Sequence, residues 1–470
     1  MKDHRTPLGA LALIAFAGGC SSVPTTADFA PVQQDVKDRA GYQVQWLRDE
    51  QAQREMEVAI NRLLQQTNLA VQDAVQIALL NNRHLQATYE ELGLAQAAWA
   101  QAGLLGNPNA DVALRWPTGS GPMVVDWGVT QNFLELLSRP LRQRVAGAEF
   151  EAAQFRVTRS VLETAGATQM AYSRLQADLQ LQELWQQVGQ STGASFETAK
   201  RLRAAGNITA LELAEEQAAD EEAKLALQAA VTRVAMGRER LNALMGLWGT
   251  QTQWTLAPRL PELPEKVEVF DNAEGRAVES SLSLQAARAD IQAAAHALGL
   301  SRATSLLPHL EAGVSAERGE GHWTFGPAVA LPLPLWDQGQ ARKAAAQAQL
   351  RRRQQRYYAQ AVDLRATARA AQLRVTEAHR RAAHYRAVVL PLHGQIVQQT
   401  QLQYNAMQVG VFRLLLAKRF SIAAAQDYVA SLHDYMAART ALDLLLMGAP
   451  PPSADDAIAK HSPLLNPQQH

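Results

Sequence analysis

The most restrictive feature of the sequence is an abrupt change from a strand pattern to a helical pattern, which occurs twice. Near residues 125–203 and again near 323–407, alternating apolar residues give way within a few positions to apolar residues spaced by three and four. No proline occurs between Pro140 and Pro258, so nothing in that stretch forces a helix to break. A helix over about residues 141–203 would be on the order of 95 Å long, which is more than a compact domain uses.

Each change follows a predicted β-hairpin, at about residues 108–134 and at about 308–332. In both hairpins apolar residues alternate with polar ones, which is typical of strands with one apolar face. The first strand of each pair carries the apolar rows Ala110, Val112, Leu114, Trp116 and Leu310, Ala312, Val314, Ala316. The polar residues predicted on the other face include Asp111, Arg115, Glu311 and Glu317.

The long helices have recognisable start signals. Ser138 and Asp337 are residue types that cap helix N-termini, and we predict them as the N-caps. Pro140 would then fall in the first helical turn, where its missing N–H removes no hydrogen bond. These signals predict that each helix starts close to the end of the preceding strand.

Each long helix is predicted to end in a short turn and to reverse into a second helix. The second long helix is expected over about residues 338–407, with a kink at Pro391. The turns are placed near Gly206 and near Gly410, where glycine would supply the positive φ that ends a helix. Each half of the chain therefore predicts a strand hairpin followed by a long helical hairpin.

Similar patterns in the two halves predict two internal structural repeats. Each repeat contains a helix, a β-hairpin and a long helical hairpin, and a proline-rich equatorial linker joins the repeats. The tail is polar and proline-rich, which predicts disorder. The predicted segments are a signal peptide (1–19), a lipidated N-terminal segment (20–70), the first repeat (71–249), the linker (250–273), the second repeat (274–448) and the tail (449–470).

The N-terminus has the layout of a bacterial export signal. Lys2 and Arg5 precede an apolar run at residues 8–17, and small residues stand ahead of Cys20. Because Cys20 is the only cysteine, it can form no internal disulfide and its thiol is free for acylation. The sequence around Cys20 resembles a lipoprotein box, which predicts a lipid anchor at this residue.

The composition argues against several classes of function. Basic and acidic residues number 45 each, so no net charge attracts nucleic acid. The motif at Gly189, Ser191 and Gly193 fits the G-x-S-x-G pattern of hydrolases, but it lies in a helical pattern without the strand that such a site needs. The histidines are scattered and lack metal-ligand spacing. We therefore predict a protein that is not an enzyme and that has no cofactor and no metal site.

Four amphipathic strands in lipid cannot close into a barrel. Open edges would leave backbone N–H and C=O groups unpaired in hydrocarbon, at a cost of several kcal/mol each. Two copies of the chain would give eight strands with a filled interior, whereas three copies would give twelve strands and a lumen. The predicted fold is therefore an α+β membrane protein, with a shared β-barrel of four strands per chain continuing into a long α-helical barrel.

Four segments of the sequence resemble TolC-type outer-membrane efflux proteins, in the lipoprotein branch that serves resistance-nodulation-division pumps. They are "GPAVALPLPLWDQGQARKAAAQAQL", "YNAMQVGVFRLLLAKR" with "DYMAARTALD" after it, "AGNITALELAEEQ" and "LLSRPLRQRVAGAEFEAAQ". The resemblance implies a homotrimer in the outer membrane, anchored at Cys20 and extending into the periplasm. It also implies a periplasmic adaptor protein and an inner-membrane pump as partners, with drugs or heavy-metal ions as cargo.

Two other functions fit the same sequence features. The chain could be the outer-membrane duct of a type I secretion system. It could also be a periplasmic adaptor lipoprotein, although an adaptor carries one helical hairpin and larger β domains.

The resemblance also implies two sets of site residues. In the family, the ends of the helical hairpins meet the adaptor, and a constriction lies just after the second end. The matching docking positions are Gly206, Asn207, Ile208, Thr209, Val409, Gly410, Val411 and Phe412. The positions nearest the constriction are Arg413, Leu416, Lys418 and Arg419, which predict a basic or apolar entrance rather than an acidic one.

Overall fold

The computed structural model describes residues 28–451, except 66, 117, 120–122, 268–269, 306–309 and 320–321. The chain divides into two compact units. Among the described residues, unit 1 takes 28–29, 90–154 and 287–355, and unit 2 takes 30–89, 155–286 and 356–451. The predicted signal peptide, Cys20 and residues 452–470 of the predicted tail lie outside the described residues. Ala449, the first residue of the predicted tail, is buried.

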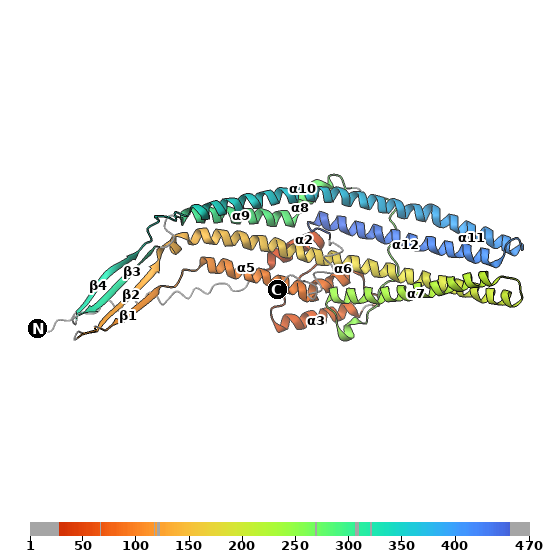
Figure 1. The fold of residues 1–470 in the computed structure, drawn as a ribbon, viewed down its shortest axis with the longest axis horizontal. Helices are drawn as coiled ribbons and strands as arrows, with labels where there is room; N and C mark the ends of the chain where they lie inside the picture. The colour runs from red at the N-terminus through yellow and green to blue at the C-terminus, as the bar shows by residue number, and fades with distance from the viewer. Residues whose placement is uncertain are drawn as a thin grey trace. The chain divides into compact units, whose positions relative to one another are not determined.

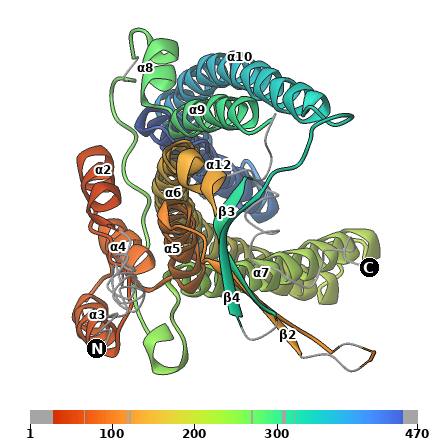
Figure 2. The same cartoon turned by 90° about the vertical axis from the view of Figure 1, so that its left-hand side faces the viewer.

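Unit 1 contains an antiparallel sheet of four strands in the order β1-β2-β3-β4 (Figures 1 and 2). The strands are β1 (Asn109–Arg115), β2 (Val124–Asn132), β3 (Glu311–Gly319) and β4 (His322–Ala330). Strands β2 and β3, which are far apart in the sequence, pair along their length from Val125↔Arg318 to Asn132↔Glu311. The two predicted hairpins therefore form one sheet.

The register places the apolar rows of all four strands on one face. Val112 lies opposite Trp127, which lies opposite Ala316, which in turn lies opposite Phe325. The rings of Trp127 and Phe325 pack edge to face with centroids 6.4 Å apart. Such cross-strand pairs stabilise a register, because a slip of one residue would move every side chain to the other face.

At the first of the two strand-to-helix junctions, β2 passes into a helix without a loop. Strand β2 ends at Asn132 and α6 (Phe133–Ala204) begins at the next residue. The Asn132 side chain accepts a hydrogen bond from the Glu135 backbone N–H (3.2 Å), and the Phe133 N–H bonds the Leu310 carbonyl (2.8 Å). The prediction of Ser138 as N-cap was wrong, because Asn132 caps the helix six residues earlier.

Because α6 begins at Phe133, Pro140 lies inside the helix and not in its first turn, where the sequence had predicted it. The second junction differs from the first, because residues 331–339 separate β4 from α10 (Gln340–His384). There Asp337 accepts a hydrogen bond from the Gly339 N–H (2.8 Å), and Gly339 has φ +74°. Asp337 therefore shapes the turn ahead of the helix and is not its N-cap.

Two pairs of helices pack together in unit 1. The part of α5 (Arg83–Gly103) in this unit packs on α6, with the rings of Trp99 and Phe150 stacked at 5.7 Å. Gly147 of α6 lies beside the Trp99 ring. On the other side of the unit, Arg353 of α10 bonds the Asp290 carbonyl of α9 (Leu282–Ala303) at 2.8 Å.

Unit 2 is a layer of long helices, in the order α7, α6, α12 and then α10 with α11 (Figure 1). Tyr172 and Leu175 of α6 pack on Val234 and Leu241 of α7 (Ala210–Met245). A second core joins Ala177 of α6 to α12 (Val411–Met447) and α10. The shorter elements of this unit are α2 (Ala30–Ala40), α3 (Glu50–Leu64), α4 (Val71–Asn81), the 3-10 turn η1 (Gly249–Thr252) and α8 (Ala273–Ser280).

A π-helical turn interrupts the second long helix, at Tyr385–Val389. It lies just before α11 (Leu390–Asn405), which has Pro391 in its first turn. The Leu390 N–H bonds the Tyr385 carbonyl, five residues back. Because Pro391 has no N–H to donate to the preceding turn, the wider π turn accommodates it.

A partly exposed network of charged side chains crosses unit 2 where α6, α12 and α10 meet. His433 of α12 lies near Arg174 and Asp178 of α6, and Asp434 beside it pairs with Arg381 of α10. Burial, followed by the positive charge of Arg174, lowers the pKa of the His433 imidazole, against the opposing effect of Asp434 and Asp178. The folded protein therefore holds His433 in its neutral form near neutral pH.

Gly313 is required for the pairing of β2 with β3. A Cβ at Gly313 would lie 1.9 Å from the Val129 carbonyl oxygen, which is backbone and cannot move aside, whereas a Cβ at Gly326 would meet nothing within 4 Å. We predict that Gly313→Ala lowers the free energy of unfolding by about 3 kcal/mol, while Gly326→Ala changes it by less than about 1 kcal/mol. Thermal unfolding of the detergent-solubilised protein measures both; equal effects would contradict this account.

His433 makes stability depend on pH. Because its pKa is lowered in the folded state, the unfolded chain binds the proton first as the pH falls below about 6.5. We therefore expect the stability to be intact above that pH and to decrease as the pH falls below it, down to the lowered pKa of the folded state. His433→Gln should remove this decrease, and the exposed His384→Gln should not. Melting temperatures across the pH range measure the effect, and identical profiles for wild type and His433→Gln would contradict it.

Candidate functional site

The sheet of unit 1 exposes large hydrophobic residues on the face where its apolar rows lie. Val112 is 70 % exposed, Phe325 64 % and Val329 64 %, and Trp323 adds a further exposed ring. The residues opposite them on neighbouring strands belong to the apolar rows of the same face. The exposed side chains therefore form one continuous apolar face. A contiguous apolar face on the surface marks contact with another protein or with a membrane.

The opposite face of the same sheet is polar and slightly hollowed. Asp111, Arg115 and Glu317 line a depression with Asp126 and Thr324. Arg115 pairs with Asp126 across the β1–β2 ladder, which offsets the like charges of Asp126 and Glu317 directly opposite each other. Glu311 lies on the same face by register, so all four polar residues predicted for one face share it.

The edges of the sheet are open in the described chain. Strand β1 pairs only with β2 and strand β4 only with β3, among the residues that the structure describes. Pro327 lies in β4, where a missing N–H is tolerated because the strand is at an edge. A sheet with a polar face, an apolar face and two open edges is suited to pairing with further strands.

The first helical hairpin, α6 with α7, is called hairpin 1. Its turn is a Schellman motif, in which Gly206 (φ +79°) donates its N–H to the Arg203 carbonyl and Asn207 donates to the Leu202 carbonyl. Thr209 then caps α7 in a reciprocal capping box with Glu212. These hydrogen bonds from Thr209 lower the pKa of the Glu212 carboxyl.

The second helical hairpin, α11 with α12, is called hairpin 2, and its turn has the same hydrogen bonds. Met407 donates its N–H to the Tyr404 carbonyl and Gln408 donates to the Gln403 carbonyl. The residue with positive φ is Met407 (φ +57°), whose side chain is 94 % exposed. The prediction that Gly410 supplies the positive φ was wrong, because Gly410 has φ −78° and is the N-cap of α12.

The turn geometry changes which positions correspond between the two hairpins. Gly206 corresponds to Met407 and Thr209 to Gly410, since each pair makes the same turn or cap. Sequence reasoning therefore missed Met407, because nothing in its residue type signals a left-handed conformation. Of the predicted docking positions, Gly206, Asn207, Thr209 and Gly410 are exposed, and Ile208, Val409, Val411 and Phe412 are partly buried.

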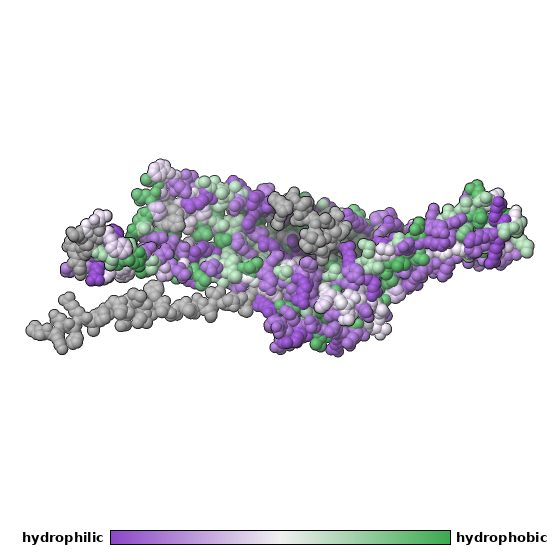
Figure 3. All heavy atoms as spheres, turned by 60° about the horizontal axis from the view of Figure 1, so that its bottom comes forward, coloured by the Kyte–Doolittle hydropathy of each residue, from purple (hydrophilic) through white to green (hydrophobic). Residues whose placement is uncertain are grey.

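The predicted constriction residues lie in the first turns of α12, just after the turn of hairpin 2. Arg413 and Lys418 are exposed, whereas Leu416 and Arg419 are partly buried. Leu414 and Ala417 between them are buried against the rest of unit 2. The charged side chains of Arg413, Lys418 and Arg419 therefore do not all lie on one side of α12. Figure 3 shows hydrophobic residues at the surface among polar ones at the end where the hairpin turns lie.

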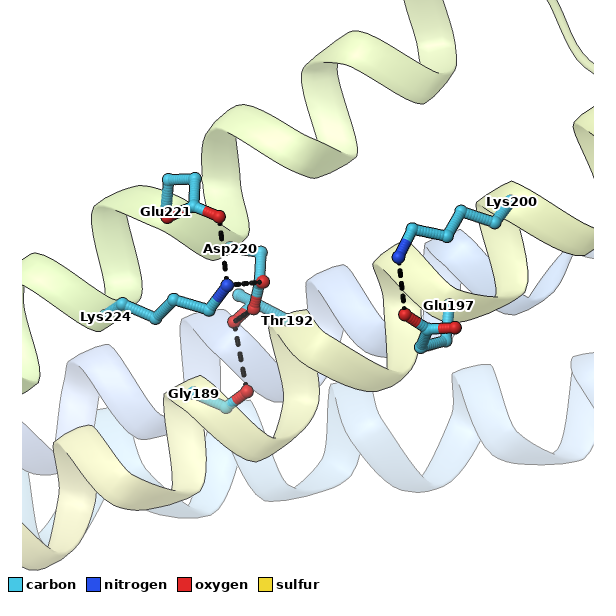
Figure 4. Close-up of polar contacts among 7 residues, drawn as sticks. All are labelled: Gly189, Thr192, Glu197, Lys200, Asp220, Glu221 and Lys224. Carbon is cyan, nitrogen blue, oxygen red and sulfur yellow. Dashed lines mark hydrogen bonds and ion pairs between the residues drawn. The ribbon is translucent and has the colours of Figure 1, made fainter.

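Polar contacts hold the two helices of hairpin 1 together near its turn (Figure 4). Thr192 of α6 donates to Asp220 of α7 (3.2 Å), whose side chain is 5 % exposed. Lys224 pairs with Asp220 (2.8 Å) and with Glu221 (2.9 Å), and these contacts raise the pKa of the lysine. One turn further on, Ser195 donates to Glu216 (2.6 Å). Paired groups of this kind satisfy the buried carboxylate of Asp220.

The motif at Gly189, Ser191 and Gly193 lies within α6, so it lacks the strand-to-helix turn of a hydrolase nucleophile. Among the described residues, no three His, Cys, Asp or Glu side chains are arranged to hold a metal ion. In the same part of the chain, none of the helices has the length and apolar character needed to span a membrane.

Solved structures of outer-membrane channels share this fold. The outer-membrane channel OprN is 16 % identical, with a TM-score of 0.67 over 91 % of this chain and 98 % of its own. The CmeC outer-membrane channel of Campylobacter jejuni is 14 % identical, with a TM-score of 0.64 over 83 % and 89 %. The MtrE outer-membrane channel of Neisseria gonorrhoeae, solved in its open state, is 17 % identical, with a TM-score of 0.61 over 81 % and 89 %.

No family model matches the sequence, and no curated protein matches it. The chain therefore has the fold of these outer-membrane channels, with a mostly helical structure and a small antiparallel sheet of four strands. At the level of the fold, the resemblance noted from the sequence is confirmed.

The two hairpin turns offer a matched pair of substitutions. Gly206→Ala places a Cβ in the left-handed region and should lower the free energy of unfolding by about 1 kcal/mol. Met407→Gly relieves the same strain and should raise it by up to about 1 kcal/mol. Thermal unfolding measures both, with Gly394→Ala, inside α11, as the control. Effects of the same sign at Gly206 and Met407 would contradict the assignment of the turns.

Proposed function

We propose that this chain is the outer-membrane channel of a tripartite efflux system, a passive duct that carries small molecules from the periplasm to the exterior. The observation that carries the proposal is the four-stranded sheet, with one apolar face, one polar face and two open edges. The fold shared with outer-membrane channels supports the same proposal.

The open edges imply that several copies share one barrel. In lipid, each unpaired backbone group at an edge costs several kcal/mol, so β1 of one copy would pair with β4 of another. Three copies would form twelve strands, which is enough for a water-filled lumen. The apolar face with Val112 and Phe325 would then contact lipid, and the polar face with Asp111 and Glu317 would line the lumen.

The long helices would carry the duct into the periplasm, where the hairpin turns would dock to an adaptor protein and an inner-membrane pump. The docking residues proposed from the resemblance are Gly206, Asn207, Ile208, Thr209, Val409, Gly410, Val411 and Phe412. Met407 joins this set, because its exposed side chain projects from the turn of hairpin 2. Arg413, Leu416, Lys418 and Arg419 remain the proposed entrance constriction, and Cys20 the proposed lipid anchor.

In this role the chain would supply no catalytic group. Energy and substrate selection would come from the pump, and the duct would contribute a path through the outer membrane. From the resemblance, we propose drugs or heavy-metal ions as the exported substrates. The sensitivity of a deletion strain to metals, dyes and antibiotics would separate these classes.

The test is whether purified protein, solubilised in detergent, is a trimer that conducts ions in a planar bilayer. Neighbouring residues on opposite faces of β4 provide the matched variants. Phe325→Asp places a charge on the proposed lipid face and should abolish insertion, because a charged side chain facing the hydrocarbon region is destabilising. Thr324→Asp on the proposed lumen face should insert normally and alter only the ion selectivity. A monomeric wild type without conductance, or equal tolerance of both variants, would overturn the proposal.

A further inference from the structure

We propose that the N-terminal segment of residues 30–40 is a clasp that holds the end of α12, where Arg39 supplies hydrogen bonds of the kind that Asn81 supplies at the end of α7. The inference goes beyond the proposed function, because it concerns how the beginning of the described chain controls one helical hairpin and not the other. It follows from a comparison of two helix ends in unit 2 that are built alike.

Helices α7 and α12 end in the same turn. At the end of α7, Gly246 has φ +65° and Leu247 donates its N–H to the carbonyl five residues back. At the end of α12, Gly448 has φ +103° and Ala449 donates its N–H to the carbonyl five residues back. Both are Schellman turns, so Gly246 corresponds to Gly448.

The start of another helix lies against each of these ends, α5 against α7 and α9 against α12. Each start has a side-chain cap, Asn82 for α5 and Ser281 for α9. The carbonyl oxygen of the residue before each cap closely approaches the glycine of the turn, at 2.7 Å from a Cβ placed on Gly246 and 2.2 Å from one placed on Gly448. These two carbonyl groups belong to Asn81 and Ser280, which therefore occupy corresponding positions.

The end of α7 receives its hydrogen bonds from asparagine side chains. Asn81 donates to the Met245 carbonyl (2.9 Å) and to the Gly246 carbonyl (2.8 Å). Asn82 donates to the Leu244 carbonyl (2.8 Å). Carbonyl groups at a helix C-terminus have no partner within the helix, so the adjoining residues of the α4–α5 junction satisfy them here.

The end of α12 has serines at the corresponding positions, and its donor comes from elsewhere in the chain. The hydroxyl of Ser280 donates to the Ala277 carbonyl within α8. Arg39 of α2 donates instead to the Met447 carbonyl (2.8 Å), the counterpart of the Met245 carbonyl, and to the Ser280 carbonyl (2.8 Å). A guanidinium also suits this place because the C-terminus of a helix carries partial negative charge.

The arginine is held in position by its own helix. Its side chain is 18 % exposed and pairs with Asp35 one turn earlier (2.6 Å). Val36, three residues before Arg39, is fully buried, and Ala40 packs on the core cluster that contains Ala449. Helix α2 therefore docks through apolar contacts that bring a fixed donor to the end of α12.

The clasp joins parts of the chain that are far apart in the sequence. Arg39 reaches a carbonyl 241 residues later at Ser280 and one 408 residues later at Met447. Because α12 is one arm of hairpin 2, docking or release of the N-terminal segment would alter the order at the end of that hairpin. The end of hairpin 1 would be unaffected, since Asn81 already satisfies it.

Hydrogen exchange of the full-length, detergent-solubilised protein, followed by mass spectrometry, tests the clasp. The reporter amides at the end of α12 are those of Leu282, Gly448 and Ala449, and at the end of α7 those of Gly246 and Leu247. Arg39→Ala should speed exchange at the α12 reporters by about tenfold or more, the factor expected for loss of hydrogen bonds from a charged donor, and leave the α7 reporters unchanged. Asn81→Ala should have the reverse effect.

A rescue variant separates the hydrogen bonds of Arg39 from the general packing of α2. Ser280→Asn gives the end of α12 the amide that the end of α7 already has, so in combination with Arg39→Ala it should restore slow exchange there. The control is Lys37→Ala, which removes an exposed positive charge from the same helix and should match the wild type. Asp35→Asn removes the partner of Arg39 without shortening the arginine, and should speed exchange at the same amides by a smaller factor. It serves as the test if Arg39→Ala does not fold.

Three outcomes would overturn the inference. The first is unchanged exchange at the end of α12 in both the Arg39→Ala and Asp35→Asn variants. The second is equal acceleration at the ends of α7 and α12, because the arginine would then stabilise unit 2 as a whole. The third is a combined variant that exchanges as fast as Arg39→Ala alone, because the missing group would then not be a donor to that carbonyl. None of these measurements depends on trimer formation or conductance, so failure of the proposed function would leave the clasp standing.

Discussion

The constraint on which the structure of unit 1 depends is the need of every backbone N–H and C=O group for a partner. The sheet satisfies its inner strands through the β1–β2, β2–β3 and β3–β4 ladders. The outer sides of β1 and β4 have no such partner among the described residues. In water these groups would be hydrated, but beside an apolar face such as that of Val112 and Phe325 the surroundings favour further strand pairing.

The same constraint explains how the strand passes into the helix. The Phe133 N–H still bonds the Leu310 carbonyl while Asn132 already accepts from Glu135, so no backbone group is left free at the change of conformation. A loop at this point would expose several such groups. The second junction uses a longer segment with Asp337 and the left-handed Gly339. Two different local solutions therefore connect a strand to a long helix in one chain.

Side-chain polarity has separate roles in unit 2. Inside hairpin 1, Thr192 and Ser195 each donate to a carboxylate of α7, which fixes how the helices align without a large hydrophobic core. In α12, burial and the positive charge of Arg174 lower the pKa of His433, which keeps its imidazole neutral near neutral pH. At the hairpin ends the charges face outward instead, and Met407 takes a strained conformation with its side chain in solvent. Strain that folding does not require is often retained for binding, which agrees with a role of the turns in docking.

The sequence by itself determined the periodic elements: two strand hairpins, two long helical hairpins and the faces on which Asp111, Arg115, Glu311 and Glu317 lie. These follow from periods of two and 3.6 residues, which are properties of the local chain. Helix starts and turns were less predictable. Asn132 rather than Ser138 caps α6, and Met407 rather than Gly410 takes the left-handed conformation.

Only the tertiary structure decided these points, because a cap or a turn is chosen by where neighbouring elements end, and residue type gives only a preference. The joining of two distant hairpins into one sheet through β2 and β3 was also decided there. So was the contact of Arg39, from the N-terminal segment, with the end of α12. Partners for a backbone edge or a charge come from residues far apart in the chain, and a local pattern contains no information on those distances.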